Sequence, residues 1–131
     1  EFPLLPPGKL FQHWEQQGVL LLNTSFTCIP GNPGSHKKVW EVFTFQLLNY
    51  INNNHPAVTW FLWGNHAEEA TSELYIQKAV RTLHPMMCFD NPGRQNDFLY
   101  GDVNGFQLLQ NEIDWTGFGG SKKWVASGSL F

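Results

Sequence analysis

The sequence lacks several features that would place it outside ordinary globular proteins. Only two of its 131 residues are cysteine, Cys28 and Cys88, and they do not form a CxxC pair. This usage argues against a disulfide framework and against a structural zinc site. No apolar run approaches the roughly 20 residues that a membrane-spanning helix needs, and residues 1–7 (EFPLLPP) have no basic region of a secretory signal. We therefore expect an intracellular protein with reduced thiols, no metal and no membrane partner.

Basic residues are also scarce. Eight Lys and Arg stand against eleven Asp and Glu, which gives a formal net charge of −3. This balance argues against a protein that is held on nucleic acid mainly by neutralising phosphates. It leaves room for a protein that contacts a few phosphates with backbone amides and reads a single base. Hydrophobic residues are plentiful at 42%, which is enough for a packed core.

Apolar patterning predicts alternating strands and helices. Alternation of this kind is typical of a layered α/β fold with a small parallel sheet. Three strands are few for such a sheet, which suggests that part of the fold lies upstream. We expect one domain over residues 1–115 and a loosely ordered Gly- and Ser-rich tail over residues 116–131. The predicted helices are 9–17, 38–52, 67–77 and 103–110, and the predicted strands are 19–22, 57–63 and 79–83.

Polar residues follow each predicted strand. Asn23 follows the first, Gly64-Asn65 the second and His84-Pro85 the third. In open parallel sheets, ligands bind at the carboxyl ends of the strands, so we expect these residues to meet at one edge. A side-chain amide can pair with the N–H and C=O groups of a base, and a neutral imidazole can donate to a developing oxyanion. Strand ends are polar in most α/β proteins, so the pattern alone also fits residues that satisfy backbone groups.

Five segments of the sequence follow one another in a characteristic order. They are residues 14–23 (WEQQGVLLLN), 35–37 (SHK) with 40–44 (WEVFT), 61–64 (FLWG) with Ala67, 82–85 (TLHP) and 113–115 (IDW). Together they resemble the family 1 uracil-DNA glycosylases: the first is similar to that family's WAxQGVLLLN, and the others to its SHxxxGWExFT, FLLWGxxA, histidine-proline loop and near-terminal IDW. The resemblance implies three layers, α/β/α, around a small central parallel sheet.

The resemblance implies an enzyme that flips uracil out of DNA, single- or double-stranded, and hydrolyses the bond between base and sugar. Asn23 would read the polar edge of uracil, and His84 would be catalytic, donating to the uracil oxygen as negative charge develops on the leaving base. The resemblance implies no cofactor. It also implies residence in the nucleus or another compartment that holds DNA.

The chain departs from the family pattern at several points. The family's GQDPY segment, which carries the water-activating aspartate, lies upstream of the triple-leucine segment, so the resemblance covers the C-terminal half only. Gly64-Asn65 stands where the family has a Gly-Ser loop that contacts a phosphate. In the loop after His84-Pro85, Met86 replaces a serine and Cys88 the inserting leucine. Met87 or Phe89 could then supply the apolar wedge.

Three interpretations remain open from the sequence. The chain could be the base-recognition half of a working glycosylase, with the other half elsewhere or on a separate polypeptide. It could instead be an inactive relative that binds DNA or a protein partner, or an unrelated small α/β protein. We expect the chain alone to be inactive and unstable, because a sheet without its neighbours exposes an edge and apolar surface.

Overall fold

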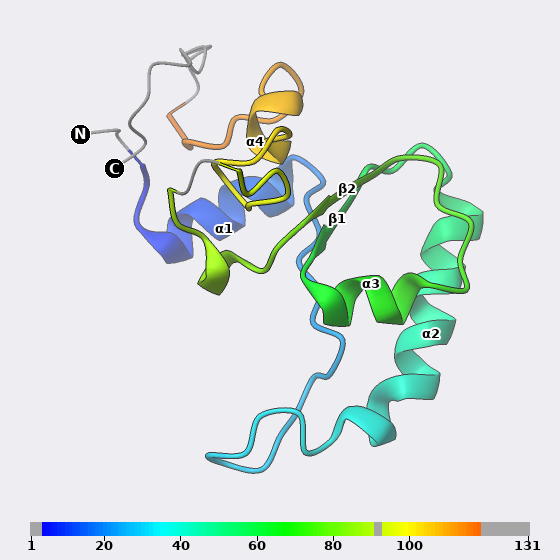
Figure 1. Cartoon of the computed structure of the whole chain (residues 1–131). Coiled ribbons are helices and arrows are strands. Elements are labelled where there is room, and N and C mark those ends of the chain that lie inside the picture. Colours follow the sequence, from blue (N-terminus) through cyan, green and yellow to red (C-terminus); the bar gives the residue numbers. More distant parts are fainter. Residues whose placement is uncertain (1–3, 91–92, 119–131) are drawn as a thin grey trace. The chain divides into compact units, whose positions relative to one another are not determined.

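The computed structural model describes residues 4–90 and 93–118 (Figure 1). Contacts divide the chain into two units: unit 1 comprises residues 1–21 and 105–131, and unit 2 comprises residues 22–104. The helices are α1 (Pro7–Gln16), α2 (Lys37–Asn54), α3 (Asn65–Thr71) and α4 (Gly105–Leu108), with a 3₁₀ turn at Pro85–Met87, and the strands are β1 (Trp60–Trp63) and β2 (Ala79–Thr82).

Unit 2 is built on a parallel pair of strands. Trp60 of β1 pairs with Ala79 of β2, and Trp63 pairs with Thr82 at the carboxyl ends. Parallel neighbours require a crossover connection, and α3 lies within it, as Figure 1 shows. The predicted α/β class with a parallel sheet is therefore confirmed.

Helix α2 is the longest element of unit 2. Its apolar spacing predicts a helix over residues 38–52, and the structure has it over Lys37–Asn54. Its side chain Leu48 is buried, and so are two side chains of the strands, Leu62 of β1 and Val80 of β2. The Thr44 hydroxyl donates to the carbonyl of Thr24 at 3.1 Å, which ties the preceding coil to α2. Within residues 4–90 and 93–118, no helix combines the length and the apolar character needed to cross a membrane.

The prediction of a strand over residues 19–22 is wrong. The amide of Val19 donates to the carbonyl of Trp14 at 3.0 Å, and Gly18 has φ of +88°, so this segment leaves α1 through a turn. The side chains of Leu20 and Leu21 are 65% and 48% exposed. A strand needs a partner for its backbone groups, and the sheet of the described residues has only the order β1–β2.

Two helices are shorter than predicted. Helix α3 ends at Thr71 instead of Gln77, because nearby hydroxyl groups compete for the last carbonyls. The Thr71 hydroxyl donates to Ala67 at 2.9 Å, and the Ser72 hydroxyl donates to Glu69 at 2.8 Å. Helix α4 covers Gly105–Leu108 within the predicted span 103–110.

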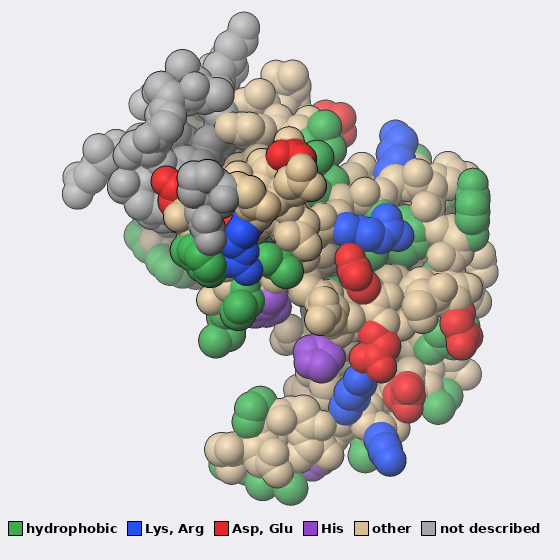
Figure 2. Space-filling model, in the orientation of Figure 1, with side chains coloured by type: hydrophobic (Ala, Val, Ile, Leu, Met, Phe, Trp, Pro, Cys, Tyr) green, Lys and Arg blue, Asp and Glu red, His purple; other side chains and the backbone are tan. Residues whose placement is uncertain are grey.

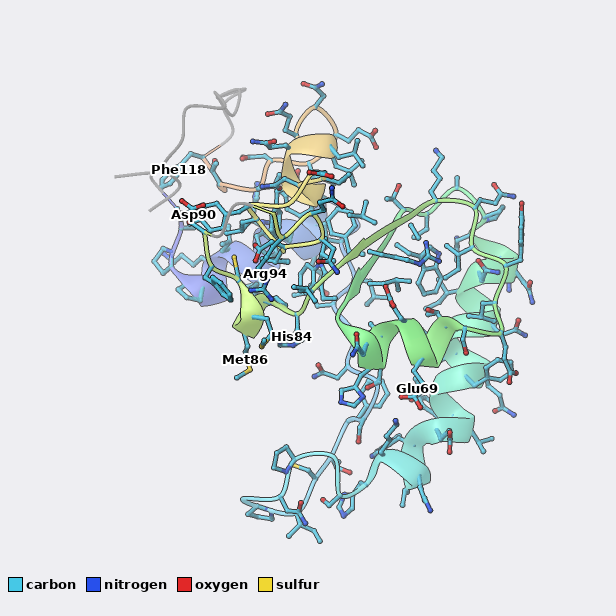
Figure 3. All side chains as sticks on the ribbon, in the orientation of Figure 1. Glu69, His84, Met86, Asp90, Arg94 and Phe118 are labelled. Atoms are coloured by element: carbon cyan, nitrogen blue, oxygen red, sulfur yellow. The ribbon has the colours of Figure 1, made fainter. Side chains whose placement is uncertain are left out.

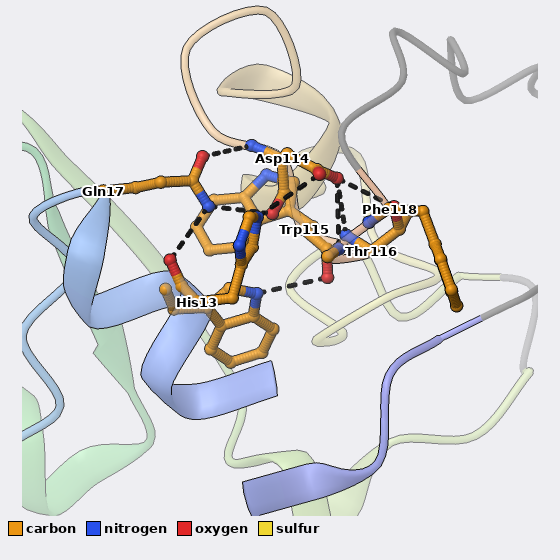
Figure 4. A network of polar contacts seen from close by, with 8 residues as sticks. His13, Gln17, Asp114, Trp115, Thr116 and Phe118 are labelled. Atoms are coloured by element: carbon orange, nitrogen blue, oxygen red, sulfur yellow. Dashed lines mark hydrogen bonds and ion pairs between the residues drawn. The ribbon is translucent and has the colours of Figure 1, made fainter. Parts of the chain in front are cut away.

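Unit 1 joins α1 to the turn that contains Asp114, Trp115 and Thr116. The Trp14 ring meets Trp115 edge to face with centroids 5.5 Å apart, and the Trp14 indole N–H donates to the Trp115 carbonyl at 3.1 Å. The Gln17 side-chain amide accepts from the Asp114 N–H at 2.7 Å and donates to the Asp114 carbonyl at 3.0 Å. In Figure 4, dashed lines join Gln17 to Asp114.

The Asp114 side chain closes that turn. One carboxylate oxygen accepts from the backbone N–H of Thr116 at 2.9 Å, from its hydroxyl at 2.8 Å and from the N–H of Gly117 at 3.2 Å. Thr116 is buried, so the beginning of the predicted tail is held in place. The rest of that tail, residues 119–131, lies outside the described residues.

Candidate functional site

The carboxyl ends of β1 and β2 bring Gly64 and His84 together, as the parallel sheet predicts. The Gly64 amide donates to the carbonyl of Thr82 at 2.8 Å, and Gly64 has φ of +84°. A Cβ atom added at Gly64 would lie 2.9 Å from Cβ of His84. Glycine is therefore required here both by the backbone conformation and by the approach of the histidine.

The ring of His84 is exposed and oriented by its own loop. Its Nδ1 atom accepts a hydrogen bond from the backbone N–H of Met86 at 3.2 Å. A neutral imidazole carries one proton, so a ring that accepts at Nδ1 must carry that proton on Nε2. Figure 3 shows His84 where the 3₁₀ turn begins. The loop thus presents an N–H donor at the carboxyl edge of the sheet.

The residues after Pro85 differ in exposure. Met86 is 87% exposed and points away from the turn in Figure 3, while Met87 and Phe89 are 52% and 49% exposed. Cys88 is half-buried, and its thiol donates to Asp97 at 3.3 Å. Cys88 therefore faces the loop interior, and Met86 is the most exposed apolar side chain of the loop.

Two residues of this loop region were missed by the sequence analysis. Asp97 is 0% exposed and accepts from the thiol of Cys88 and from the backbone N–H groups of Phe89, Leu99 and Tyr100. Arg94 lies 3.8 Å from that carboxylate. The segment that contains them reads as a polar surface loop, and no local pattern indicates that its aspartate is buried.

The environment of Asp97 changes the acidity of two groups. Burial by itself raises the pKa of Asp97, but the hydrogen bonds from Tyr100, Leu99, Cys88 and Phe89 outweigh it, so the pKa lies below its ordinary value. The pKa of the Cys88 thiol is raised, first by burial and then by its hydrogen bond to Asp97. Near neutral pH, the loop therefore contains a carboxylate that is ionised and a thiol that is protonated.

Asn23 is exposed and lies in the coil that precedes α2. Within the described part of the chain, no hydrogen bond joins Asn23 to His84 or to another residue. The neighbouring Thr24 is fixed to α2 through its carbonyl. Because the 19–22 segment is not paired in the sheet, the structure does not place Asn23 at the edge that carries Gly64 and His84. Its role in reading a base stays a prediction.

A cavity of about 400 Å³ lies beside α2 and α3, away from His84. Its walls include Lys37 and the carboxylates Glu41, Glu69 and Glu73. Figure 2 shows acidic and basic side chains alternating over these helices. This excess of carboxylates does not suit a polyanionic ligand. Among residues 4–90 and 93–118, no three His, Cys, Asp or Glu side chains are grouped closely enough to hold a metal ion.

Comparison with curated proteins identifies the relatives of the chain. It is 34% identical over 122 residues to a uracil-DNA glycosylase of Brevibacillus brevis, an alignment of 85% of this chain and 51% of that protein. It is 36% identical over 107 residues to uracil-DNA glycosylase 1 of Listeria innocua, covering 78% of this chain and 48% of that protein. A uracil-DNA glycosylase of Exiguobacterium sibiricum is 35% identical over 118 residues, with coverages of 86% and 53%.

The chain spans about half the length of the curated relatives that it matches. No family model matches the sequence, and no solved structure matches it. The agreement with relatives from several bacteria nevertheless extends over most of the chain. It also agrees with the five short segments that the sequence shares with the family. Over the part that aligns, the chain therefore belongs to the uracil-DNA glycosylases.

Proposed function

We propose that this chain carries the base-recognition part of a uracil-DNA glycosylase. The observation that carries the proposal is the ring of His84, whose Nδ1 accepts the N–H of Met86 so that a neutral ring offers its Nε2–H to solvent. Hydrolysis adds water across the bond between the sugar carbon and uracil N1, and the base leaves as an anion. A fixed N–H donor stabilises that anion more than it stabilises the bound base, which lowers the barrier.

The proposal covers recognition and stabilisation of the leaving base, and not the whole reaction. The relatives are about twice as long as the part that aligns, so we assign the activation of water to the other half of such a protein. Asn23 is proposed to pair with the polar edge of uracil. The DNA that contains uracil is the proposed partner, and the compartment that holds the DNA is the proposed location.

We propose that the loop after His84 contacts the DNA. Met86 is proposed as the apolar wedge that fills the space of the flipped nucleotide, because it is 87% exposed while Cys88 faces inward. Met87 and Phe89, each about half exposed, would line the same surface. The other proposed contacts to the DNA backbone are Gly64, Asn65 and Pro85, which lie at the same edge of the sheet.

The test of His84 uses a single-stranded oligonucleotide with one uracil and a matched one with thymine. We expect no uracil release from this chain alone, and release, detected by alkaline strand cleavage, after addition of the N-terminal half of a relative. His84→Ala should reduce the release rate by roughly a hundredfold or more, in line with the loss of an oxyanion donor. His66→Ala is the control, because the His66 side chain is 80% exposed and lies on α3. Release that is equal in the two variants would exclude the assigned role.

The test of Met86 compares duplex with single-stranded substrate. A wedge replaces the flipped nucleotide within the stack, so Met86→Ala should weaken binding to the duplex and leave binding to the single strand nearly unchanged. Tyr75→Ala removes a side chain of similar exposure, 85%, from another part of unit 2. Equal losses on both substrates would instead indicate a nonspecific contact.

A further inference from the structure

Asp97 is the most deeply buried side chain on the sheet edge that carries His84. It is 0% exposed, against 3% for the core residue Leu62. Burying a carboxylate is unfavourable unless hydrogen bonds replace its water. The hydrogen-bond partners of Asp97 therefore show which segments its buried carboxylate joins.

These partners belong to two segments. On its own segment, Asp97 accepts from the N–H groups of Leu99 and Tyr100 at 3.1 and 3.2 Å. On the segment after His84, it accepts from the Cys88 thiol and from the Phe89 N–H, each at 3.3 Å. The carboxylate thus fastens the loop of His84 to the turn at residues 94–97.

Arg94 holds the same loop at the adjacent residue. Its Nη1 donates to the carbonyl of Met87 at 2.8 Å, and its guanidinium lies 4.0 Å from the centroid of the Phe89 ring. A guanidinium over an aromatic face is a favourable contact. Figure 3 shows Arg94 on the side of the turn opposite Met86. Three consecutive residues, 87–89, are therefore held by Arg94 and Asp97.

The same turn also holds the chain before His84. The Leu83 amide donates to the carbonyl of Asn96 at 2.8 Å. His84 therefore lies between two attachment points, Leu83 on one side and Met87 on the other, and both attach to residues 94–97. The Met86 N–H that orients the ring lies between the same two points.

We propose that Asp97, together with Arg94, is a positioning residue for His84: the 94–97 turn fixes the loop on both sides of the histidine and so sets the direction of its Nε2–H. The inference rests on the proposed function for its catalytic meaning. Its structural content, the orientation of the ring, can be measured without any activity.

The primary test compares Asp97→Asn with Asp102→Asn. Asp102 is exposed and lies on the same segment, so it is a matched control. The Cys88 thiol and the Phe89 N–H donate to different oxygens of Asp97. An amide has only one accepting oxygen, so Asp97→Asn loses one of these two bonds. In ¹⁵N spectra of the full chain, we expect the His84 Nδ1 resonance to lose its hydrogen-bonded shift and the Met86 amide to exchange faster. Both signals should stay unchanged in Asp102→Asn.

Kinetics supply the second readout. If the chain releases uracil, the single-turnover rate of Asp97→Asn should fall roughly tenfold to a hundredfold, the scale of a misplacement of about 1 Å. Its Kd for a uracil oligonucleotide should change less than twofold, because the contacting side chains remain. A rate and a Kd that both match wild type would contradict the positioning role.

A second variant covers the case in which Asp97→Asn does not fold. Arg94→Lys keeps the charge but loses the planar group that reaches Met87 and stacks on Phe89. It should produce the same changes at His84 and Met86 to a smaller degree. Unchanged spectra in the folded variant overturn the proposal, even if wild type is active. If wild type supplemented with the N-terminal half of a relative releases no uracil, the proposed function fails, and the spectra alone decide the positioning of His84.

Discussion

At the residue scale, the structure selects a tautomer of His84 through a single backbone amide. The Met86 N–H occupies Nδ1, so a neutral ring can only donate from Nε2. The sequence predicts that a histidine follows β2 and that a glycine follows β1. It cannot predict the ring orientation, because that depends on how the following loop is held by Arg94 and Asp97.

Gly64→Ala should disturb His84 more than Gly34→Ala does. The new Cβ would lie 2.9 Å from Cβ of His84, in addition to the strain of φ at +84°. We expect a loss of about 1–3 kcal/mol in the free energy of unfolding and a changed His84 ring resonance. Gly34→Ala separates the two causes, since Gly34 has φ of +81° and no atom within 4 Å. Urea denaturation and ring ¹⁵N shifts check both, and an unchanged His84 in Gly64→Ala would refute the contact.

The two cysteines should differ in reactivity. Cys28 is exposed, whereas burial and the hydrogen bond to Asp97 raise the pKa of Cys88. The thiolate is the reactive form, so iodoacetamide should label Cys28 several-fold faster near neutral pH. Peptide mass spectrometry measures both rates in one sample, and the urea-unfolded chain, where the rates should converge, is the control. Equal rates in the folded chain would mean that the thiol of Cys88 is not held by Asp97.

At the scale of elements, the sequence predicts an element well where a local pattern determines it. It predicts poorly where contact with another segment determines the structure. Helix α2 and strand β2 form close to their predicted spans, and β1 covers the second half of its span. The pattern does not predict burial equally well, because only Thr44 and Leu48 are buried on α2. The run at residues 19–22 has an equally apolar pattern, but within the described residues it does not pair in the sheet. The burial of Asp97 likewise depends on the loop from Met87 to Phe89, which no local pattern shows.

The turn at residues 94–97 should loosen in acid. The pKa of Asp97 in the folded chain lies below its ordinary value of 3.8, so the folded state binds fewer protons than the unfolded state near that pH. The contribution of Asp97 to stability is therefore complete above its ordinary pKa and is lost as the pH falls through the lowered value. The charged and titratable partners at the carboxylate are Arg94 and Cys88.

Amide exchange of Phe89 and urea denaturation, followed from about pH 6 to about pH 3, measure this dependence. Asp97→Asn should be less stable at neutral pH by about 1–3 kcal/mol, the usual effect of leaving buried donors unpaired, and should lose this acid dependence. An acid transition of equal size in the variant would assign it to other carboxylates.

At the scale of the whole molecule, family membership was predictable from five short segments, and the comparisons confirm it. The division into two units was not predicted, because it depends on contacts between residues far apart in sequence. Unit 1 joins Trp14 to Trp115 and Gln17 to Asp114. Unit 2 contains the sheet, α2, α3 and the loop of His84.

Asp114→Ala should destabilise unit 1 selectively. The carboxylate accepts three hydrogen bonds from Thr116 and Gly117, so its removal should cost about 1–3 kcal/mol of local stability. Hydrogen-exchange mass spectrometry should show faster exchange in peptides from residues 4–21 and 105–118, with residues 22–104 unchanged. Asp102→Ala, at an exposed site in unit 2, serves as the control. Faster exchange throughout the chain would show that the two units unfold together.

Unit 1 is formed by two segments that lie far apart in the sequence, and this affects the order in which the two units can fold during synthesis. Residues 22–104 form a continuous stretch, so unit 2 has all its parts once that stretch has left the ribosome. Trp14 and Gln17 must wait for their partners at residues 114 and 115. At ordinary rates of translation, that delay is on the order of ten seconds. Throughout this time, α1 lacks its packing and its hydrogen bond to Trp115.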